Sequence, residues 1–168
     1  MHKTSLLEAV ANLYFTPERG GVEMFDAAVA GIDLVIGPED DLSLPETFTL
    51  LKDESVEEPD GPITLEDVAV LEGCESYVKG EKMLVREKEA GKRAGLRAAK
   101  ALLRQQHLIP VEWRGNKVLI FTGMIVRDRD GLRFVACACW DGDRWYLAWG
   151  WLDNYFDSGN RAMRVPRK

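Results

Sequence analysis

The sequence predicts an α+β fold, in which short N-terminal helices and one long helix pack on a C-terminal antiparallel β-meander of about four strands. Apolar residues recur at helical spacing up to about residue 107, and the period changes to two from about residue 111. Glycine- and aspartate-rich turn sequences separate the later apolar runs. We therefore expect one folded unit with an acidic helical or extended region at 1–62, a long amphipathic helix at 63–107 and a sheet at 108–168.

The N-terminal region predicts two short helices and little other regular structure. Ser5 and Glu8 match a capping box, which begins a helix that runs to about Phe15. Residues 22–30 form a second short helical pattern, and residues 32–36 predict a brief strand. The acidic, proline-containing residues 39–62 predict a long surface connection with an edge strand at 47–50.

The long helix is predicted from Thr64, with acidic residues in its first turn to match the helix dipole. Its inner face in the first half contains Val68, Leu71, Tyr77 and Val78. Gly80 predicts a break or bend, because a mid-helix glycine costs about 1 kcal/mol relative to alanine. The second half then runs from about residue 81 to residue 106.

The C-terminal sheet is predicted from apolar runs that alternate with turns. The turns contain Arg114-Gly-Asn, Asp130-Gly and Asp141-Gly-Asp. The predicted strands are 109–113, 117–126, 132–140 and 144–151. Consecutive hairpins of this kind build an antiparallel meander.

Composition indicates a soluble globular protein, with 46% hydrophobic and 30% charged residues in 168. No apolar run approaches the roughly 18–20 residues of a membrane span, so we expect no membrane partner. The N-terminus lacks the apolar region of a secretory signal. Cys74, Cys137 and Cys139 are a sparse, odd set, which favours a reducing compartment and a cytoplasmic location.

The charges are strongly segregated along the chain. Residues 1–75 carry a net charge of −15, and residues 76–168 carry +9. Such an asymmetry indicates either an internal electrostatic contact between the two parts or a surface for a charged partner.

Seven charged residues, Glu89 among them, are spaced three or four apart in the predicted helix 81–106 and would lie on one face; the six cations of this set are the first candidate binding residues. They are Lys82, Arg86, Arg93, Arg97, Lys100 and Arg104. The opposite face is small, with Leu84, Gly91, Gly95, Ala98 and Leu102. The basic stripe could bind phosphates or an acidic protein surface. Alternatively, it is a solvated face or is docked against the acidic half of the same chain.

The five tryptophans are the next candidates, because aromatic platforms flanked by arginine can stack nucleobases or sugars. Trp145 and Trp149 share one face of a predicted strand, which is also how a sheet buries large side chains against a helix. We therefore assign these two to the core and keep Trp113 and Trp151 as candidate binding residues.

No pattern predicts catalysis, a cofactor or a metal. The carboxylates Asp141, Asp143, Asp153 and Asp157 could hold Mg²⁺ for a hydrolase, but aspartates in such turns also accept backbone hydrogen bonds. The cysteines lack nearby histidines, and we interpret them as small buried hydrophobic residues. No glycine-rich phosphate loop or nucleophile elbow is present, so the sequence predicts a non-enzyme.

Three functional hypotheses follow. The first is a small binding protein that acts through protein–protein contacts, such as a regulator or inhibitor of a larger machine, using the basic helix or an acidic patch with Glu54, Glu57 and Glu58. The second is a nucleic-acid-binding module that uses the basic stripe. The third is a metal-assisted hydrolase that uses the four aspartates. The sequence leaves the oligomeric state open.

Overall fold

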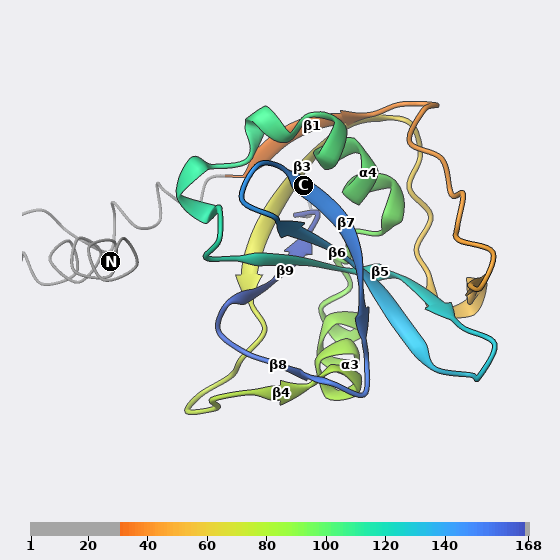
Figure 1. Cartoon of the computed structure of the whole chain (residues 1–168), viewed down its shortest axis with the longest axis vertical. Helices are drawn as coiled ribbons and strands as arrows, with labels where there is room; N and C mark the ends of the chain where they lie inside the picture. Colours follow the sequence, from red (N-terminus) through yellow and green to blue (C-terminus); the bar gives the residue numbers. More distant parts are fainter. Residues whose placement is uncertain (1–30, 167–168) are drawn as a thin grey trace, which may run out of the picture. The chain divides into compact units, whose positions relative to one another are not determined.

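The main feature of the computed structural model, which describes residues 31–166, is a curled mixed sheet (Figure 1). Its strand order is β1-β3-β9-β5-β6-β7, and β2 pairs with β5 beside this path. These strands are β1 (Ile32–Ile36), β2 (Thr49–Leu50), β3 (Gly61–Ala69), β5 (Val118–Arg127), β6 (Arg133–Trp140), β7 (Trp145–Trp151) and β9 (Asn160–Arg164). The helices predicted at 5–15 and 22–30 lie outside the described residues.

The remaining elements are short. A separate two-stranded sheet pairs β4 (Val78–Lys79) with β8 (Tyr155–Phe156). The α-helices of residues 31–166 are α3 (Gly80–Ala90) and α4 (Leu96–Arg104). Three 3₁₀ turns are η2 (Lys52–Glu54), η3 (Gln106–Leu108) and η4 (Val111–Trp113).

The predicted fold class, with one long helix on an antiparallel meander, is wrong. The first part of the expected helix is the nine-residue strand β3, in which Leu65 and Asp67 are buried. An aspartate at a buried strand position hides the period-two pattern, so the segment resembles the acidic first turn of a helix. The buried carboxylate of Asp67 is tolerated because Lys117 Nζ and Arg161 Nε bind it at 2.8 Å and 2.9 Å.

The second part of the expected helix is broken between α3 and α4. Gly91 ends α3 in the left-handed conformation, with φ of 69°, which glycine adopts without steric cost. The link then runs beside β9 and β5, because Ala94 N–H donates to Met163 C=O at 3.2 Å and Gly123 N–H donates to Ala94 C=O at 2.8 Å. These hydrogen bonds to β9 and β5 hold the connection between the helices in an extended form, so α3 ends before it and α4 begins after it.

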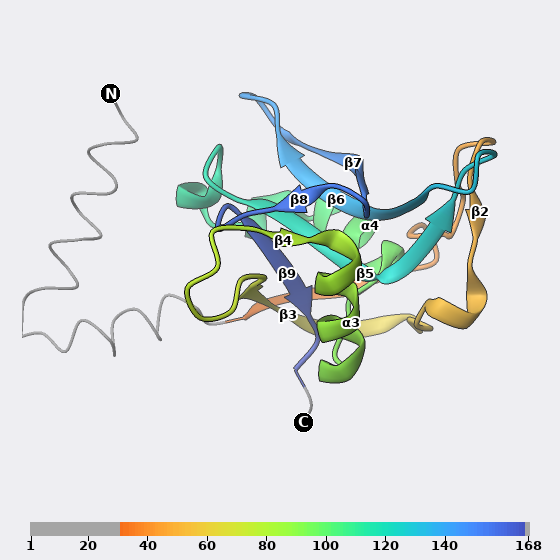
Figure 2. The ribbon, with the colours of Figure 1, turned by 90° about the horizontal axis from the view of Figure 1, so that it is seen from below.

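The two helices cover opposite faces of the sheet (Figures 1 and 2). Side chains alternate between faces along β5, so Leu119 and Phe121 join one hydrophobic cluster and Ile120 joins the other. Leu102 of α4 packs in the first cluster and Leu84 of α3 in the second. The predicted apolar seam and the basic stripe therefore do not follow one helix face.

Strand β9 makes the sheet mixed, which the sequence did not predict. It lies between β3 and β5, antiparallel to β3 and parallel to β5. The expectation of a strand at 109–113 is also wrong, because Pro110 precedes the 3₁₀ turn η4. The predicted strand at 32–36 and the hairpins that join β5, β6 and β7 are confirmed.

Strand β5 contains an irregularity between Phe121 and Ile125, where the register with β6 shifts. Gly123 lies inside it, and a Cβ atom on this glycine would lie 2.6 Å from the backbone of Ala94. The bulge thus lets the α3–α4 link approach the sheet at backbone-to-backbone distance.

Candidate functional site

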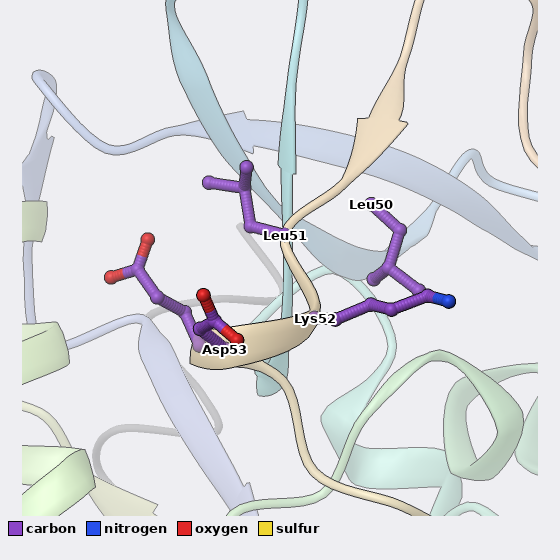
Figure 3. Close-up of a pocket in the computed structure, with 5 residues that line it drawn as sticks. Leu50, Leu51, Lys52 and Asp53 are labelled. Carbon is purple, nitrogen blue, oxygen red and sulfur yellow. The ribbon is translucent and has the colours of Figure 1, made fainter.

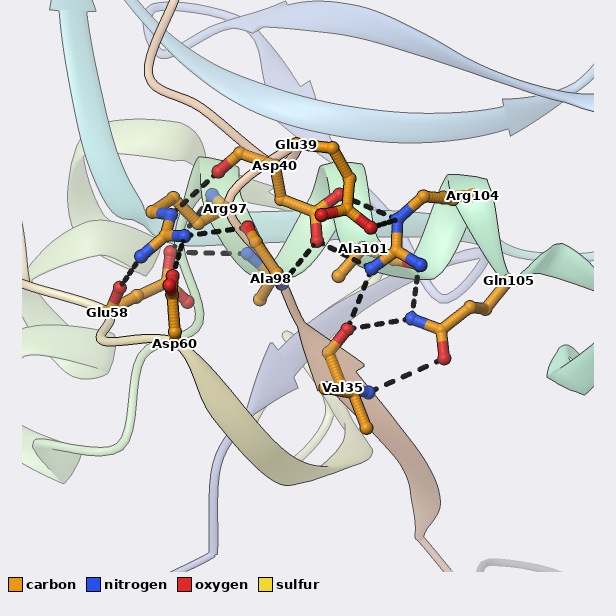
Figure 4. A network of polar contacts seen from close by, with 11 residues as sticks. Val35, Glu39, Asp40, Glu58, Asp60, Arg97, Ala98, Ala101, Arg104 and Gln105 are labelled. Atoms are coloured by element: carbon orange, nitrogen blue, oxygen red, sulfur yellow. Dashed lines mark hydrogen bonds and ion pairs between the residues drawn. The ribbon is translucent and has the colours of Figure 1, made fainter.

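Arg97 of α4 is the centre of a polar network in which the basic and acidic parts of the chain meet (Figure 4). Its guanidinium donates to the backbone carbonyls of Asp40 at 2.6 Å, Glu58 at 2.5 Å and Gly37 at 2.8 Å. It also forms an ion pair with Asp60. We call residues 37–60 the acidic strap, because Arg97 binds both of its ends.

Arg104 and Lys100 extend this network along α4. Arg104 binds the buried carboxylate of Asp40 through Nε at 3.1 Å and Nη2 at 2.7 Å, and its Nε also lies 3.3 Å from Glu39. Lys100 Nζ is 2.9 Å from Asp41. Burial alone would raise the pKa of Asp40, but hydrogen bonds from Arg104 and a backbone N–H lower its pKa overall. Some of the basic residues in the second part of the chain thus form ion pairs with acidic residues in the first part.

The remaining cations of the predicted stripe also have partners within the chain. Arg86 makes two hydrogen bonds to Glu75, at 2.9 Å and 2.6 Å, and Lys82 lies 3.6 Å from the same carboxylate. The hydrogen bonds from Arg86 lower the pKa of Glu75 to about 2. Arg93 donates to the backbone carbonyls of Glu54 and Thr122 at 3.0 Å and 2.6 Å.

The three predicted acidic binding residues have different surroundings. Glu54 contacts Lys88 at 2.6 Å and forms an ion pair with Arg133. The hydrogen bond from Lys88 is the largest cause that lowers the pKa of Glu54. Glu57 is exposed and has no ion pair among residues 31–166. Glu58 binds the backbone at the start of α4, so these three residues do not form one acidic patch.

Glu58 caps the N-terminus of α4 from a distant part of the sequence. Its carboxylate accepts the backbone N–H groups of Gly95 at 3.0 Å, Arg97 at 3.1 Å and Ala98 at 3.3 Å. These groups have no partner inside a helix, and the helix dipole favours a negative charge there. Burial raises the pKa of Glu58, and the three N–H groups oppose this shift without cancelling it.

Two buried carboxylates were not singled out from the sequence. Asp67 is bound by Lys117 and Arg161, as described above, and Glu87 accepts two hydrogen bonds from Arg164 at 2.9 Å and 2.7 Å. Both side chains are 3% exposed. The partners lie 50 to 94 residues away, so no local pattern could have revealed them. They connect β3 and α3 to β9 and to Lys117, the residue before β5, which is a structural role.

The candidate tryptophans are divided between core and surface. Trp113 is 7% exposed, and the Lys117 ammonium lies 4.1 Å from its ring centroid. Trp151 is 39% exposed at the end of β7. Trp145 is buried, and Trp149 packs partly buried against Phe48, with ring centroids 4.9 Å apart.

The four aspartates of the hydrolase hypothesis are not brought together as a metal site. Asp141 accepts the backbone N–H groups of Asp143 and Arg144, and Asp157 accepts that of Gly159, as turn aspartates do. Asp153 pairs with Lys79 at 3.1 Å. Within residues 31–166, no cluster of three or more histidine, cysteine, aspartate or glutamate side chains has metal-binding geometry.

The cysteines are free thiols in different environments. Cys137 is buried, and burial raises its pKa to about 12. Cys139 is partly buried with a raised pKa, whereas Cys74 is exposed, which differs from the predicted burial of all three. A raised thiol pKa lowers the fraction of reactive thiolate at neutral pH, so Cys137 and Cys139 are poor nucleophiles.

The hollows on the surface are open. One of about 470 Å³ is lined by the five residues 50–54, including Leu50, Leu51 and Lys52 (Figure 3). Another of about 280 Å³ is lined in part by Lys117, Trp140 and Asn160. The Lys117 ammonium is already bound to Asp67, which leaves the second hollow without a free charge from this residue.

The exposed residues Tyr77, Lys79 and Tyr155 form a cluster that we call the tyrosine patch. Its tyrosines are 61% and 58% exposed, and their rings meet edge-to-face with centroids 4.9 Å apart. Lys79 Nζ lies 5.8 Å from the centroid of Tyr155. The pairing of β4 with β8 places Lys79 opposite Tyr155. The prediction that Tyr77 belongs to an inner helix face is wrong.

No helix of the described part of the chain is long and apolar enough to span a membrane. No family model matches the sequence, and neither the curated proteins nor the solved structures include a significant match.

Proposed function

We propose that the protein is a small non-enzymatic binding protein that acts through protein–protein contacts, as a regulator or inhibitor of a larger assembly. The observation that carries this proposal is the tyrosine patch, in which two tyrosines remain exposed although they pack on each other. Tyrosine is enriched at protein interfaces, because it adds a large apolar area and a polar hydroxyl with few rotatable bonds.

The geometry of the patch favours binding at a low entropic cost. The edge-to-face contact between Tyr77 and Tyr155 restrains both rings before a partner arrives. The ion pair of Lys79 with Asp153, at 3.1 Å, restrains the cation beside them. A partner with an apolar or carboxylate-bearing surface would thus meet an ordered platform.

The ion pairs of the basic residues favour this proposal over the nucleic-acid alternative. A phosphate would have to displace Asp60, Asp41 and Asp40 from the cations of α4. The turn hydrogen bonds of Asp141 and Asp157 likewise occupy the carboxylates that the hydrolase alternative requires. The three free cysteines fit the proposed cytoplasmic location.

Site-specific photo-crosslinking tests the proposal. A benzophenone amino acid replaces Tyr155, and a control variant carries it at Val111, which is 63% exposed and lies on η4. After irradiation in cells that produce the chain, we expect a discrete adduct with one protein from position 155 and none from position 111. The adduct should disappear when Tyr77→Ser is added.

Two results would contradict the proposal. One is an adduct removed by nuclease but not by protease, which would favour the nucleic-acid alternative. The other is the same set of adducts from both positions, which would mean that the patch has no preferred partner.

A further inference from the structure

Strand β7 has an edge with unpaired backbone groups, and this edge is separate from the tyrosine patch. Among residues 31–166, β7 is the last strand of the sheet and pairs with β6 alone. Consecutive residues of an antiparallel strand direct their backbone N–H and C=O groups alternately toward and away from the neighbouring strand. The residues that point away from β6 therefore determine what the edge can bind.

Four hydrogen bonds identify these residues. Both backbone groups of Trp145 bind the side chain of Gln106, so Trp145 points away from β6. Just beyond the ends of the ladder, Leu152 N–H donates to Arg133 C=O and Asp141 N–H donates to Arg144 C=O, each at 3.0 Å. Counting from either end gives the same alternation.

The outward residues in the middle of β7 are Leu147 and Trp149. Among the described residues, the backbone N–H and C=O groups of these two residues have no hydrogen-bond partner. The outward positions on either side are partly closed. The side chain of Gln106 binds the backbone groups of Trp145, and Asn154 N–H donates to Trp151 C=O at 3.1 Å. The free groups are thus arranged symmetrically about Ala148.

We propose that a second copy of this chain occupies this edge, with the two β7 strands antiparallel about a twofold axis at Ala148. In this register Leu147 lies opposite Trp149 of the second copy, and the two residues exchange both of their backbone hydrogen bonds. The same exchange occurs on the other side of the axis. The closed position at Trp145 then faces the partly closed position at Trp151, so the ladder ends at the same place in both copies.

The side chains beside the axis are compatible with the same register. Tyr146, which is 42% exposed, lies opposite Gly150 of the second copy. Gly150 has no space for a side chain, because a Cβ atom would lie 2.9 Å from Cys137 Sγ. A cross-strand aromatic ring covers an edge glycine of this kind. Ala148 meets its own equivalent, where two small side chains allow close approach.

The other face of the paired strands would join apolar residues. Trp149 lies opposite Leu147 of the second copy, which is a favourable aromatic–aliphatic cross-strand pair. Trp151, 39% exposed in the single chain, lies opposite Trp145 of the second copy. An unrelated extended peptide could use the backbone groups alone, whereas the second copy also supplies the side-chain pairs.

Disulfide trapping tests the register. Cys137 and Cys139 lie opposite Ala148 and Tyr146 within one chain, so the background carries Cys74→Ser, Cys137→Ala and Cys139→Ala. In it, Ala148→Cys places two cysteines at a non-hydrogen-bonded pair between the copies, where Cα atoms are about 4.5 Å apart and a disulfide can form. The control Tyr146→Cys is more exposed, but its equivalents would be four strand positions apart, or more than about 13 Å. We expect a disulfide-linked dimer with Ala148→Cys and none with Tyr146→Cys under the same mild oxidation.

A second variant tests the pairing without a cysteine. The N–H of Leu147 points away from β6, so Leu147→Pro removes a donor of the proposed dimer and no hydrogen bond of the single chain. In sedimentation velocity, we expect the native chain to dimerise as its concentration rises and a folded Leu147→Pro variant to remain monomeric. Circular dichroism verifies that the variant is folded.

Several results would overturn the inference. One is a native chain that stays monomeric at about 100 µM, where a dimer of micromolar Kd is populated. Another is equal trapping of the two cysteine variants, or a folded Leu147→Pro variant that dimerises like the native chain. A monomer that instead binds an extended peptide at β7 would exclude the second copy as occupant. Crosslinking at position 155 reports on the proposed function separately from all of these.

Discussion

Gln106 binds Trp145 through both backbone groups of that residue. Its Oε1 accepts the N–H at 3.0 Å, and its Nε2 lies 3.4 Å from the carbonyl oxygen. The preceding residue, Gln105, contacts Val35 in the same way, with Nε2 2.8 Å from the carbonyl oxygen and Oε1 3.5 Å from the backbone nitrogen. Two consecutive side chains after α4 thus reach β7 and β1, the two edge strands of the sheet.

This arrangement partly caps the two edge strands of the curled sheet. An edge strand with unpaired groups is a template for unwanted pairing, and proteins cover such edges with other elements. Here the side-chain amides of Gln105 and Gln106 each bind the backbone N–H and C=O groups of one edge residue, as a neighbouring strand would. Within the part of the chain that the structure describes, the outward backbone groups in the middle of β7, at Leu147 and Trp149, have no partner, which is the basis of the proposed self-pairing.

Replacement of Gln106 by alanine should destabilise the fold. Gln106→Ala leaves the partly buried backbone groups of Trp145 without their partner, and each such hydrogen bond contributes about 1 kcal/mol. We expect a loss of about 1–2 kcal/mol in the free energy of unfolding, measured with urea. His107→Ala, at an exposed position beside it, should change this value little. Equal effects of the two substitutions would exclude the capping role.

The buried carboxylate of Asp67 should be more sensitive. Asp67→Asn removes the negative charge but leaves Lys117 and Arg161 in place, which are 27% and 21% exposed. Removal of one partner from a buried ion pair typically costs about 3–5 kcal/mol. The exposed control Glu57→Gln should shift the urea midpoint little. A loss no larger than that of the control would contradict a stabilising role for the charge of Asp67.

Gly123 should not tolerate a methyl group. In Gly123→Ala, the new Cβ atom would lie 2.6 Å from the backbone of Ala94, and neither strand β5 nor the α3–α4 link can move away freely. Overpacking of this kind costs about 1–3 kcal/mol, measured by thermal or urea unfolding. At Gly159 the nearest atom to a new Cβ is Asp157 Oδ1 at 3.2 Å, so Gly159→Ala is the matched control. Similar stabilities for the two variants would contradict the close approach.

The raised pKa of Glu58 leads to a prediction about pH. A carboxyl whose folded pKa is raised stabilises the fold below its unfolded pKa of about 4.3, and this stabilisation is lost as pH rises through the folded pKa. The stability of the native chain relative to Glu58→Gln should therefore be greater at pH 4 than at pH 7. Urea unfolding of both chains across this range measures the difference. The opposite sign would mean that the three N–H groups outweigh burial.

The acidic strap should depend on the shape of the Arg97 side chain as well as on its charge. Arg97→Lys keeps the charge, but one ammonium cannot reproduce the fork that reaches the carbonyls of Gly37, Asp40 and Glu58. We expect faster hydrogen–deuterium exchange across residues 37–60, with smaller changes in β5 and β6. Arg127→Lys, at an exposed position, is the control. Unchanged exchange would show that Arg97 does not hold the strap.

The sequence predicted correctly the elements that depend on neighbouring residues and failed where an element depends on contacts between residues far apart in the chain. The strand at 32–36 and the hairpins of β5, β6 and β7 were predicted because alternation and turn residues are local signals. β3 was mistaken for a helix because its buried Asp67 interrupts the apolar alternation. The tyrosine patch could not be predicted, because it requires β4 to pair with the distant strand β8, which places Lys79 opposite Tyr155.

The sequence by itself determined that opposite charges occupy different parts of the chain and that its end forms hairpins, because composition and period-two alternation are properties of neighbouring residues. Tertiary structure alone decided that the cations of α4 bind the acidic strap and that β9 enters the sheet between β3 and β5. Both depend on contacts between residues far apart in the chain. Such contacts are selected by burial and hydrogen bonding in the folded chain, which no pattern of neighbouring residues contains.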